Sequence, residues 1–172
     1  TIDEAQEFIY IAVMDYFPRS LYRYGNNTFW PEIDNALRRA ALDRRVHVRL
    51  LASRWNHTRA DMAGFLCSLS ALGLNIPNVQ LETRLFVVPV TDPSQADIPF
   101  SRVNHNKYMV TERTAYVGTS NWSEDYFTAT TGVGLSLTAV EETSAGIPAQ
   151  LRDIFLRDWT SPYAEIPVCK QG

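Results

Sequence analysis

The sequence predicts an α/β domain in which helices cover a mixed central sheet. Segments typical of strands alternate with segments of helical periodicity along most of the chain, a pattern typical of layered α/β folds. The composition, 45% hydrophobic and 20% charged with a formal net charge of −3, is that of a globular protein. Because 172 residues are enough for one domain with its own core, we expect a single domain over residues 1–172.

The first predicted element is a strand at residues 7–14, EFIYIAVM, whose unbroken apolar run is typical of a strand covered on both faces. A helix is predicted at residues 30–44, where apolar residues recur at helical spacing and Pro31 lies in the first turn. The same patterns place the remaining elements at strand 46–52, helix 59–72, strand 79–88, hairpin 108–118, strand 132–138 and helix 149–159.

The segment most informative about function carries His105, Lys107 and Asn121 around the predicted hairpin. On a strand, residues two apart share a face, so His105 and Lys107 are expected to point the same way. Gly118 and the small residues after it allow a turn that brings Asn121 beside them. An imidazole can attack phosphorus or transfer a proton near neutral pH, and fixed donors neutralise the non-bridging oxygens. The group therefore predicts a phosphodiester site, although each residue alone is more often a surface or turn residue.

This segment resembles the signature of the phospholipase D superfamily, H-x-K-x-x-x-x-D followed by G-[ST]-x-N. His105, Lys107 and Asn121 match it residue for residue, and Glu112 stands where most members carry Asp. The H-x-K-x-x-x-x-E form, with the run 103–123 around it, resembles the second motif of the lumenal, membrane-anchored branch that acts as 5′ exonucleases on single-stranded DNA and RNA. The likeness covers nearly the whole chain.

The resemblance implies a phospholipase D-like layered α/β/α domain that forms one half of a pseudo-twofold pair. In such a pair, one imidazole attacks phosphorus to give a phosphohistidine, while the other protonates the leaving oxygen and then activates water. His105 is expected to be one of the two, with the acid/base role favoured. Lys107 and Asn121 would hold the non-bridging oxygens, so neither a metal nor another cofactor is expected, and no cluster with metal-ligand spacing is visible.

Four further positions are candidates for the site. Glu112 is expected to orient the cationic partner or to pair with a nearby arginine, Arg102 or Arg113, rather than to touch substrate. Ser120, Tyr16 and Trp122 are candidate substrate contacts, because Tyr16 follows the first strand, where ligands often bind, and aromatic faces hold unpaired bases. Core packing is the alternative for both aromatic residues. Residues 54–57, Arg-Trp-Asn-His, either line the approach to the site or form a solvent-exposed turn.

The resemblance also implies a partner, because that branch carries two such motifs and this sequence contains one. The favoured source of the second motif is an N-terminal half, present as another chain or removed; a second copy of this half and an isolated inactive fragment are the alternatives. The expected substrate is single-stranded nucleic acid held at its end, since the composition lacks a basic excess. A phospholipid substrate for a lipid phosphodiesterase or transphosphatidylase is the alternative, as is a catalytically silent module.

Cysteines and sequons bear on the compartment. Cys67 and Cys169 allow one internal pairing, expected in an oxidising lumen but not in a reducing compartment. Asn26 and Asn56 begin glycosylation sequons, and a third begins at Asn121, where a glycan would obstruct the site. The resemblance implies an endolysosomal or ER/Golgi lumen and a membrane-anchored or secreted precursor. No apolar run reaches the roughly 18 residues of a membrane span, so an anchor is expected outside this sequence.

Overall fold

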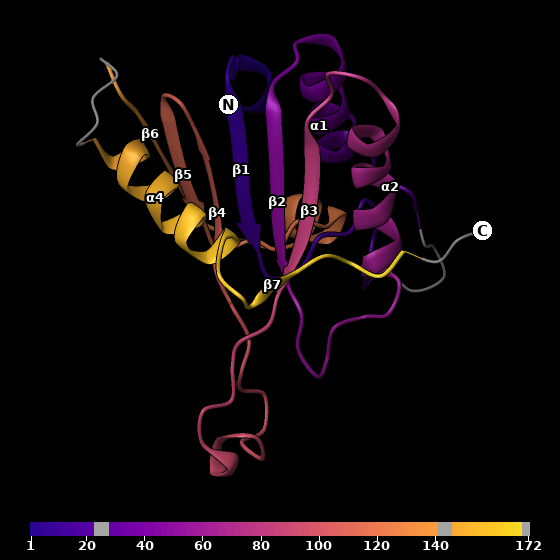
Figure 1. The fold of residues 1–172 in the computed structure, drawn as a ribbon, viewed down its shortest axis with the longest axis vertical. Helices are drawn as coiled ribbons and strands as arrows, with labels where there is room; N and C mark the ends of the chain where they lie inside the picture. The colour runs from indigo at the N-terminus through magenta and orange to yellow at the C-terminus, as the bar shows by residue number, and fades with distance from the viewer. Residues whose placement is uncertain (23–27, 141–145, 170–172) are drawn as a thin grey trace.

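The computed structural model describes residues 1–22, 28–140 and 146–169 (Figure 1). Its strands are β1 (Phe8–Val13), β2 (His47–Ser53), β3 (Leu81–Phe86), β4 (Lys107–Thr111), β5 (Thr114–Gly118), β6 (Gly134–Thr138) and β7 (Ala164–Glu165). Its helices are α1 (Glu32–Asp43), α2 (Met62–Asn75), α3 (Glu124–Thr128) and α4 (Ile147–Trp159), with short 3-10 turns η1 (Ile2–Glu4) and η2 (Pro93–Gln95). The predicted α/β fold class is confirmed.

The strands form one mixed sheet in the order β6-β5-β4-β1-β2-β3-β7. β1, β2 and β3 run parallel to one another, whereas β4 runs antiparallel to β1. The first residue of β4 therefore lies beside the last residue of β1, with Lys107 paired to Val13. The end of the sheet that holds the carboxyl ends of β1, β2 and β3 and the start of β4 is called the carboxyl edge below.

Helices cover both faces of the sheet, α1 and α2 on one side and α4 on the other (Figure 1). Alternate side chains of β1 contribute to the hydrophobic cores on the two faces of the sheet, because successive side chains on a strand point to opposite faces. Ile9 and Ile11 pack with α1 and α2, while Tyr10 stacks on Phe155 of α4 with ring centroids 4.9 Å apart. This arrangement explains the continuous apolar run, since each fully buried aliphatic side chain contributes about 1.5–3 kcal/mol.

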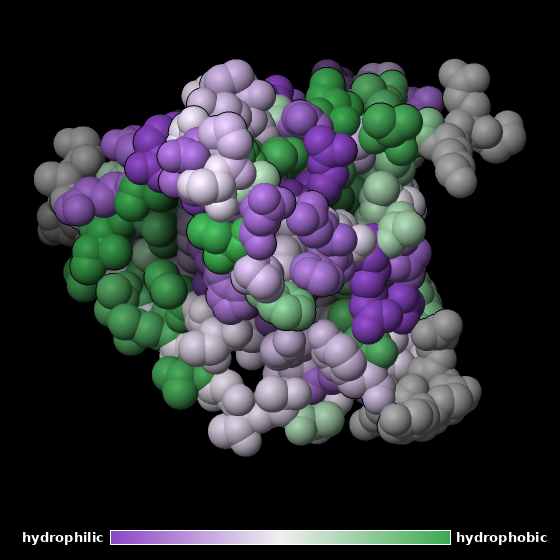
Figure 2. Space-filling model, turned by 90° about the horizontal axis from the view of Figure 1, so that it is seen from below, coloured by the Kyte–Doolittle hydropathy of each residue, from purple (hydrophilic) through white to green (hydrophobic). Residues whose placement is uncertain are grey.

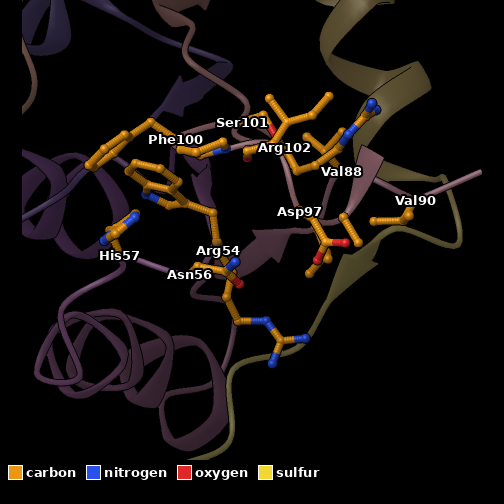
Figure 3. Close-up of a pocket in the computed structure, with 14 residues that line it drawn as sticks. Arg54, Asn56, His57, Val88, Val90, Asp97, Phe100, Ser101 and Arg102 are labelled. Atoms are coloured by element: carbon orange, nitrogen blue, oxygen red, sulfur yellow. The ribbon is translucent and has the colours of Figure 1, made fainter. Parts of the chain in front are cut away.

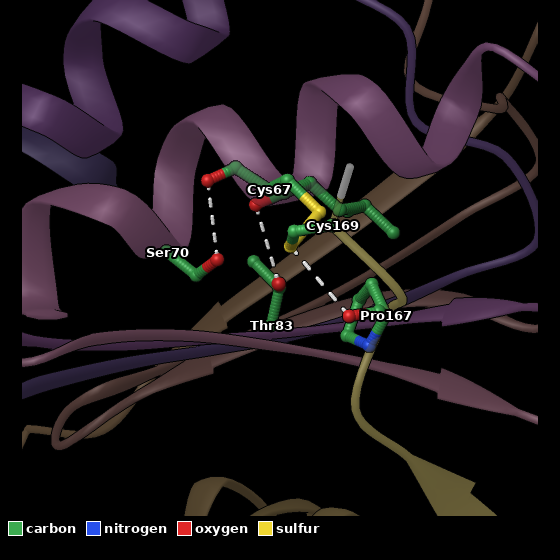
Figure 4. Close-up of a disulfide and its surroundings, with 6 residues drawn as sticks. Cys67, Ser70, Thr83, Pro167 and Cys169 are labelled. Carbon is green, nitrogen blue, oxygen red and sulfur yellow. Dashed lines mark hydrogen bonds between the residues drawn. A yellow bond between two sulfur atoms is a disulfide. The ribbon is translucent and has the colours of Figure 1, made fainter. Parts of the chain in front are cut away.

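Two features at the end of the chain secure β3. The two residues of β7 pair antiparallel with Leu85 and Phe86 at the carboxyl end of β3; so short a strand has no periodicity and was not predicted. Cys67 of α2 is bonded to Cys169 with a Cα–Cα distance of 5.7 Å, which places the predicted disulfide between the helix and the tail (Figure 4). The tail is thus held against the same helix that packs on β3.

A long connection, residues 87–106, leaves the carboxyl edge between β3 and β4 and extends well beyond the sheet before returning (Figure 1). It carries η2 in the part farthest from the sheet, and its last residues include His105, two positions before Lys107 opens β4. The position of the candidate site therefore depends on where this connection rejoins the sheet. Its return is fixed by Met14, whose backbone N–H donates to the carbonyl of Asn106 at 3.0 Å.

Candidate active site

His105 and Lys107 meet at the carboxyl edge. Lys107 opens β4 and is 5% exposed, whereas His105 precedes the strand and is exposed. The Lys107 Nζ lies 3.1 Å from His105 Nδ1 and donates to the His105 carbonyl oxygen at 2.8 Å. The two side chains were expected to share the face of a strand; β4 begins only at Lys107, yet they converge. Because an ammonium group has only donors, Nδ1 accepts, which leaves the proton of the neutral ring on Nε2.

Asp15, two residues beyond β1, joins Asn121 to this pair. The Asn121 amide donates to Asp15 Oδ2 at 3.1 Å. The backbone holds the two segments together, because Trp122 N–H donates to the Asp15 carbonyl at 3.0 Å and Phe17 N–H donates to the Trp122 carbonyl at 2.8 Å. The turn after β5 therefore delivers Asn121 to the carboxyl edge, where the expected group of imidazole, ammonium and amide is assembled.

Burial sets the charge states of this cluster. It lowers the pKa of His105; the Lys107 charge lowers that pKa further, and Asp15 opposes both effects. Burial also lowers the pKa of Lys107, against the attraction of Asp15. The pKa of Asp15 is raised by burial, against the charges of Lys107, Arg59 and His105. His105 therefore loses its proton at a lower pH than a free histidine, and Asp15 gains one at a higher pH than a free aspartate.

Glu112 lies at the opposite end of β4 from Lys107, about 16 Å away along the strand. Its carboxylate accepts hydrogen bonds from the backbone N–H groups of Gln6, Glu7 and Phe8 at 3.0, 3.3 and 3.4 Å. The expected role beside Lys107, or in a pair with an arginine, is therefore wrong. Glu112 instead links the start of β1 to the end of β4. This link helps to fix the register of the two strands, which in turn places Lys107 beside Val13 at the carboxyl edge.

Two of the predicted substrate contacts belong to the core. Tyr16 is 1% exposed and donates from Oη to Asp34 Oδ1 at 2.7 Å, and Trp122 is 4% exposed. Neither presents a free ring face to a base, so the structure contradicts their assignment as stacking residues and supports the alternative of core packing. Ser120 is half-buried beside Asn121, with Oγ 3.5 Å from the carbonyl oxygen of Tyr126. It stays a candidate by position.

The structure adds residues that sequence patterns did not select. Asp15 had a positional signal, since it follows a buried strand where ligands often bind, but no motif marked it. Arg59 and Tyr22 had no such signal; Arg59 was placed at the start of the predicted helix 59–72, but α2 begins at Met62 and leaves it in the preceding connection. The Arg59 guanidinium lies 5.8 Å from the centroid of the Tyr22 ring, and that ring meets Tyr126 edge-on at 6.2 Å. Tyr22 is 57% exposed and so lines an open part of the surface.

The sequons within the described residues lie in different environments. Asn26 lies outside the described residues, Asn56 is exposed in a turn, and Asn121 is buried, with its amide donating to Asp15.

Within residues 1–22, 28–140 and 146–169, no three His, Cys, Asp or Glu side chains are grouped so as to hold a metal ion. No helix there has both the length and the apolar character needed to cross a membrane.

Comparison with known proteins places the chain in a family. Residues 1–91, more than half of the chain, match the family described as "PLD3/4, PLD-like domain". Over 163 residues the chain is 53% identical to 5'-3' exonuclease PLD3 of Rattus norvegicus and 52% identical to 5'-3' exonuclease PLD3 of Homo sapiens. Each alignment covers 95% of this chain, and they cover 33% of the rat protein and 32% of the human protein. It is 47% identical over 167 residues to 5'-3' exonuclease PLD4 of Mus musculus, covering 95% of this chain and 33% of that protein. The chain thus spans about a third of the length of the curated relatives it matches, and it belongs to the PLD-like domain family of PLD3 and PLD4.

Proposed function

We propose that this chain is one catalytic half of a phosphodiesterase that removes nucleotides from the 5′ end of single-stranded DNA or RNA. The observation that carries the proposal is the convergence of His105 and Lys107, 3.1 Å apart, with Asn121 at the same edge of the sheet. The names of the relatives, 5'-3' exonucleases at about half identity, support this choice of substrate and polarity. They support it over a phospholipid substrate, which the same three side chains would also suit.

The reaction proceeds in two displacements at phosphorus. In the first, an imidazole nitrogen forms a P–N bond as the bridging P–O bond breaks, and the leaving oxygen takes a proton from the second imidazole. In the second, that imidazole accepts a proton from water, whose oxygen bonds to phosphorus as the P–N bond breaks. Lys107 and the Asn121 amide hold the non-bridging oxygens, whose negative charge grows in each transition state.

The local geometry favours the acid/base role for His105. Lys107 donates to Nδ1, so in the neutral ring Nε2 carries the proton and has no lone pair with which to attack phosphorus. In the protonated ring, the neighbouring ammonium makes loss of the proton easier, as the lowered pKa of His105 reflects. Easier loss of the proton suits an imidazolium that gives its Nε2 proton to a leaving oxygen. The ring that remains carries its proton on Nδ1, so its Nε2 lone pair can then accept a proton from water. The nucleophile would then come from the second half.

The second half is proposed to pack on the β5–β6 face, defined by Val117, Val133, Leu135 and Leu137. All four are exposed, between 38% and 75%, and β6 is the edge strand at that side of the sheet. Figure 2, which looks onto the carboxyl edge, has apolar side chains gathered on the side where α4, β5 and β6 lie. Exposed apolar edges of this kind mark interaction surfaces. An N-terminal half is the favoured occupant, and a second copy is the alternative.

We also propose that the protein works in an oxidising lumen of the endolysosomal or secretory system. The Cys67–Cys169 disulfide and the exposed sequon residue Asn56 support this compartment, because disulfides persist in oxidising compartments and sequons are glycosylated in the secretory lumen. Treatment of the cell-derived protein with an endoglycosidase should lower its apparent mass, and Asn56→Gln should remove one step of that shift. An unmodified Asn56 together with a free thiol at Cys67 would contradict the proposal.

The function is tested on the full-length protein with single-stranded oligonucleotides labelled at one end. Release of the label as a mononucleotide should be immediate from the 5′ end and delayed from the 3′ end, and His105→Ala should abolish it. The control is His47→Gln, which removes a histidine at the start of β2, the end of that strand far from the cluster. Transfer of a phosphatidyl group to an alcohol with no cleavage of oligonucleotides would favour the lipid alternative.

A further inference from the structure

A hollow of about 320 Å³ lies at the carboxyl edge, between the segment that follows β2 and the long connection before β4 (Figure 3). Residues 54–57 form one wall, and residues 96–102, with Val87, Val88 and Val90, form the other. None of the side chains of the His105 cluster is needed to build it. The two walls come from segments that are far apart in the sequence and meet only in the folded chain.

Aromatic rings dominate one end of this hollow. The rings of His57 and Phe100 are stacked, with centroids 4.7 Å apart and an interplanar angle of 15°, and Trp55 meets His57 edge-on at 4.7 Å. Phe100 is 73% exposed, so the stack covers only part of its ring. An exposed aromatic ring held by a stacked neighbour is a rigid surface on which a further planar group gains contact without ordering a flexible side chain.

The wall also carries strain and unpaired donors. Phe100 and Arg102 adopt φ values of 55° and 58°, a left-handed backbone that non-glycine residues rarely occupy and that is concentrated at ligand sites. Trp55 Nε1 and Arg102 Nε are buried and have no hydrogen-bond partner within the described part of the chain. Buried donors of this kind call for an acceptor, and both residues line the hollow.

The hollow is fixed close to the catalytic cluster. Arg102 is three residues from His105, so their backbones are at most about 11 Å apart. Ser53, which precedes Arg54, accepts at Oγ from the Asn104 N–H at 3.1 Å. Ser53 also donates from its backbone N–H to the Met14 carbonyl at 3.2 Å, next to Asp15. A ligand that placed a phosphate at His105 could therefore extend into this hollow over a short distance.

The charges of the lining favour a neutral ring over a second phosphate. Arg54 turns away from His57 and Phe100 and forms an ion pair with Glu165 of β7 (Figure 3). Asp97 adds a carboxylate to the opposite wall, which would repel an anion. Asn56 and Ser101 add polar groups that can pair with the edge of a base.

We propose that this hollow binds a nucleobase of the single-stranded substrate, adjoining the phosphate held at His105, with the base stacked on Phe100. The proposal rests on the proposed function and adds to it a subsite that grips the strand by its base rather than by its backbone. Because stacking is tolerant of base identity, the subsite would add affinity for unpaired strands without selecting a sequence. A paired base, stacked within a duplex, would not be free to enter it.

The test compares Phe100→Ala, Phe100→Trp and Phe29→Ala in the full-length protein. Phe29 is a matched control, since it is also an exposed phenylalanine, at 63%, and does not line the hollow. Phe100→Ala should raise KM for a single-stranded oligonucleotide by about tenfold and leave kcat for the same oligonucleotide unchanged. Phe100→Trp should retain the KM of the unmodified protein, as should Phe29→Ala.

A scan of abasic sites through the first nucleotides of the oligonucleotide locates the contact. One abasic position should raise KM of the unmodified protein by the same factor as Phe100→Ala and should have no further effect on that variant. Equal KM for Phe100→Ala and unmodified protein would overturn the subsite while leaving the exonuclease proposal intact. Failure of the unmodified protein to release nucleotides from any oligonucleotide would overturn the proposed function, and the subsite with it.

Discussion

Folding and the phosphate binding proposed for Lys107 place opposite demands on this residue. Its side chain is 5% exposed, and burial lowers its pKa, so folding disfavours the charge that the proposed site needs. An ammonium group that has already lost much of its water interacts more strongly with a phosphate oxygen than a hydrated one. The residue is therefore better explained by binding than by stability.

Lys107→Met should separate these two demands. Loss of the donor should lower kcat on oligonucleotides by about 10²- to 10³-fold. Because the folded-state pKa is lowered, the penalty on the charged form is fully present at neutral pH, so the variant should unfold at the same temperature or higher. Thermal unfolding and initial rates measure the two effects. A large loss of stability with activity retained would show that the lysine is mainly structural.

Asp15 should control the pH dependence through His105. The pKa of His105 is already lowered from 6.5, and Asp15 is the group that raises it. Asp15→Asn should therefore lower this pKa further; with His105 as the acid, activity falls as pH rises through that pKa, so the alkaline limb of the bell-shaped kcat profile should move to lower pH. An unmoved limb would exclude His105 as the titrating acid.

The same variant has a separate effect on folding. The folded-state pKa of Asp15 is raised above 3.8, so the cost of its charge is absent below 3.8 and fully present above the raised pKa. Asp15→Asn should consequently stabilise the protein at neutral pH and have little effect in strong acid. Unfolding measured at both pH values distinguishes this electrostatic effect from a loss of packing, which would lower stability at both.

At the scale of elements, the site depends on the register between β1 and β4. That register places Lys107 beside Val13 at one end and Glu112 beside the start of β1 at the other. A carboxylate that accepts hydrogen bonds from three backbone N–H groups strongly stabilises this pairing, because hydrogen bonds to charged groups are worth about 1.5–3 kcal/mol each. The glutamate of the motif thus acts on the strands that carry the site.

Glu112→Gln should weaken these hydrogen bonds without a direct effect on the reaction. The uncharged amide keeps the shape but accepts more weakly, so the free energy of unfolding should fall by about 1–2 kcal/mol. Activity per folded molecule should fall less than in His105→Ala. Chemical unfolding and rates normalised to folded protein provide the measurement, and a loss of activity equal to that of His105→Ala in fully folded protein would indicate a direct chemical role.

The disulfide acts on another pair of elements, α2 and the tail that follows β7. Its two cysteines are 102 residues apart in the sequence, so it closes a long loop. Cys169→Ser should lower the free energy of unfolding by about 2–4 kcal/mol, measured in urea under non-reducing conditions. The double variant with Cys67→Ser should match the single one, which excludes an effect of the free thiol. No change in stability would mean that the bond is dispensable for holding the tail.

At the scale of the whole molecule, one motif supplies one imidazole, and the two-displacement scheme needs two. The β5–β6 face is the surface proposed to meet the second half. Leu135→Lys should lower activity strongly, because a charge there opposes burial of the face. Leu74→Lys is the control, since Leu74 is exposed on α2. Measurement of the native mass of both variants and of the unmodified protein distinguishes a second copy of this chain from an N-terminal half as the partner. Equal activity of all three proteins would place the interface elsewhere.

Local patterns in the sequence determined the α/β class, the order of the main strands and helices, and the identity of His105, Lys107 and Asn121 as a group. Periodicity and motif spacing are carried by residues close together in the chain, so they could be recognised without a structure. The choice between a site role and a core role for Tyr16 and Trp122 could not be made in this way, because both roles favour the same aromatic residues.

Only the tertiary structure decided what surrounds the motif. Asp15 joins Asn121 because the turn after β5 pairs with the segment after β1, and Glu112 leaves the site because β4 carries it to the far end of the sheet. The hollow between residues 54–57 and 96–102 arises in the same way, from two connections that meet at one edge. These contacts join residues distant in sequence, and their geometry is set by strand pairing and packing rather than by local preference.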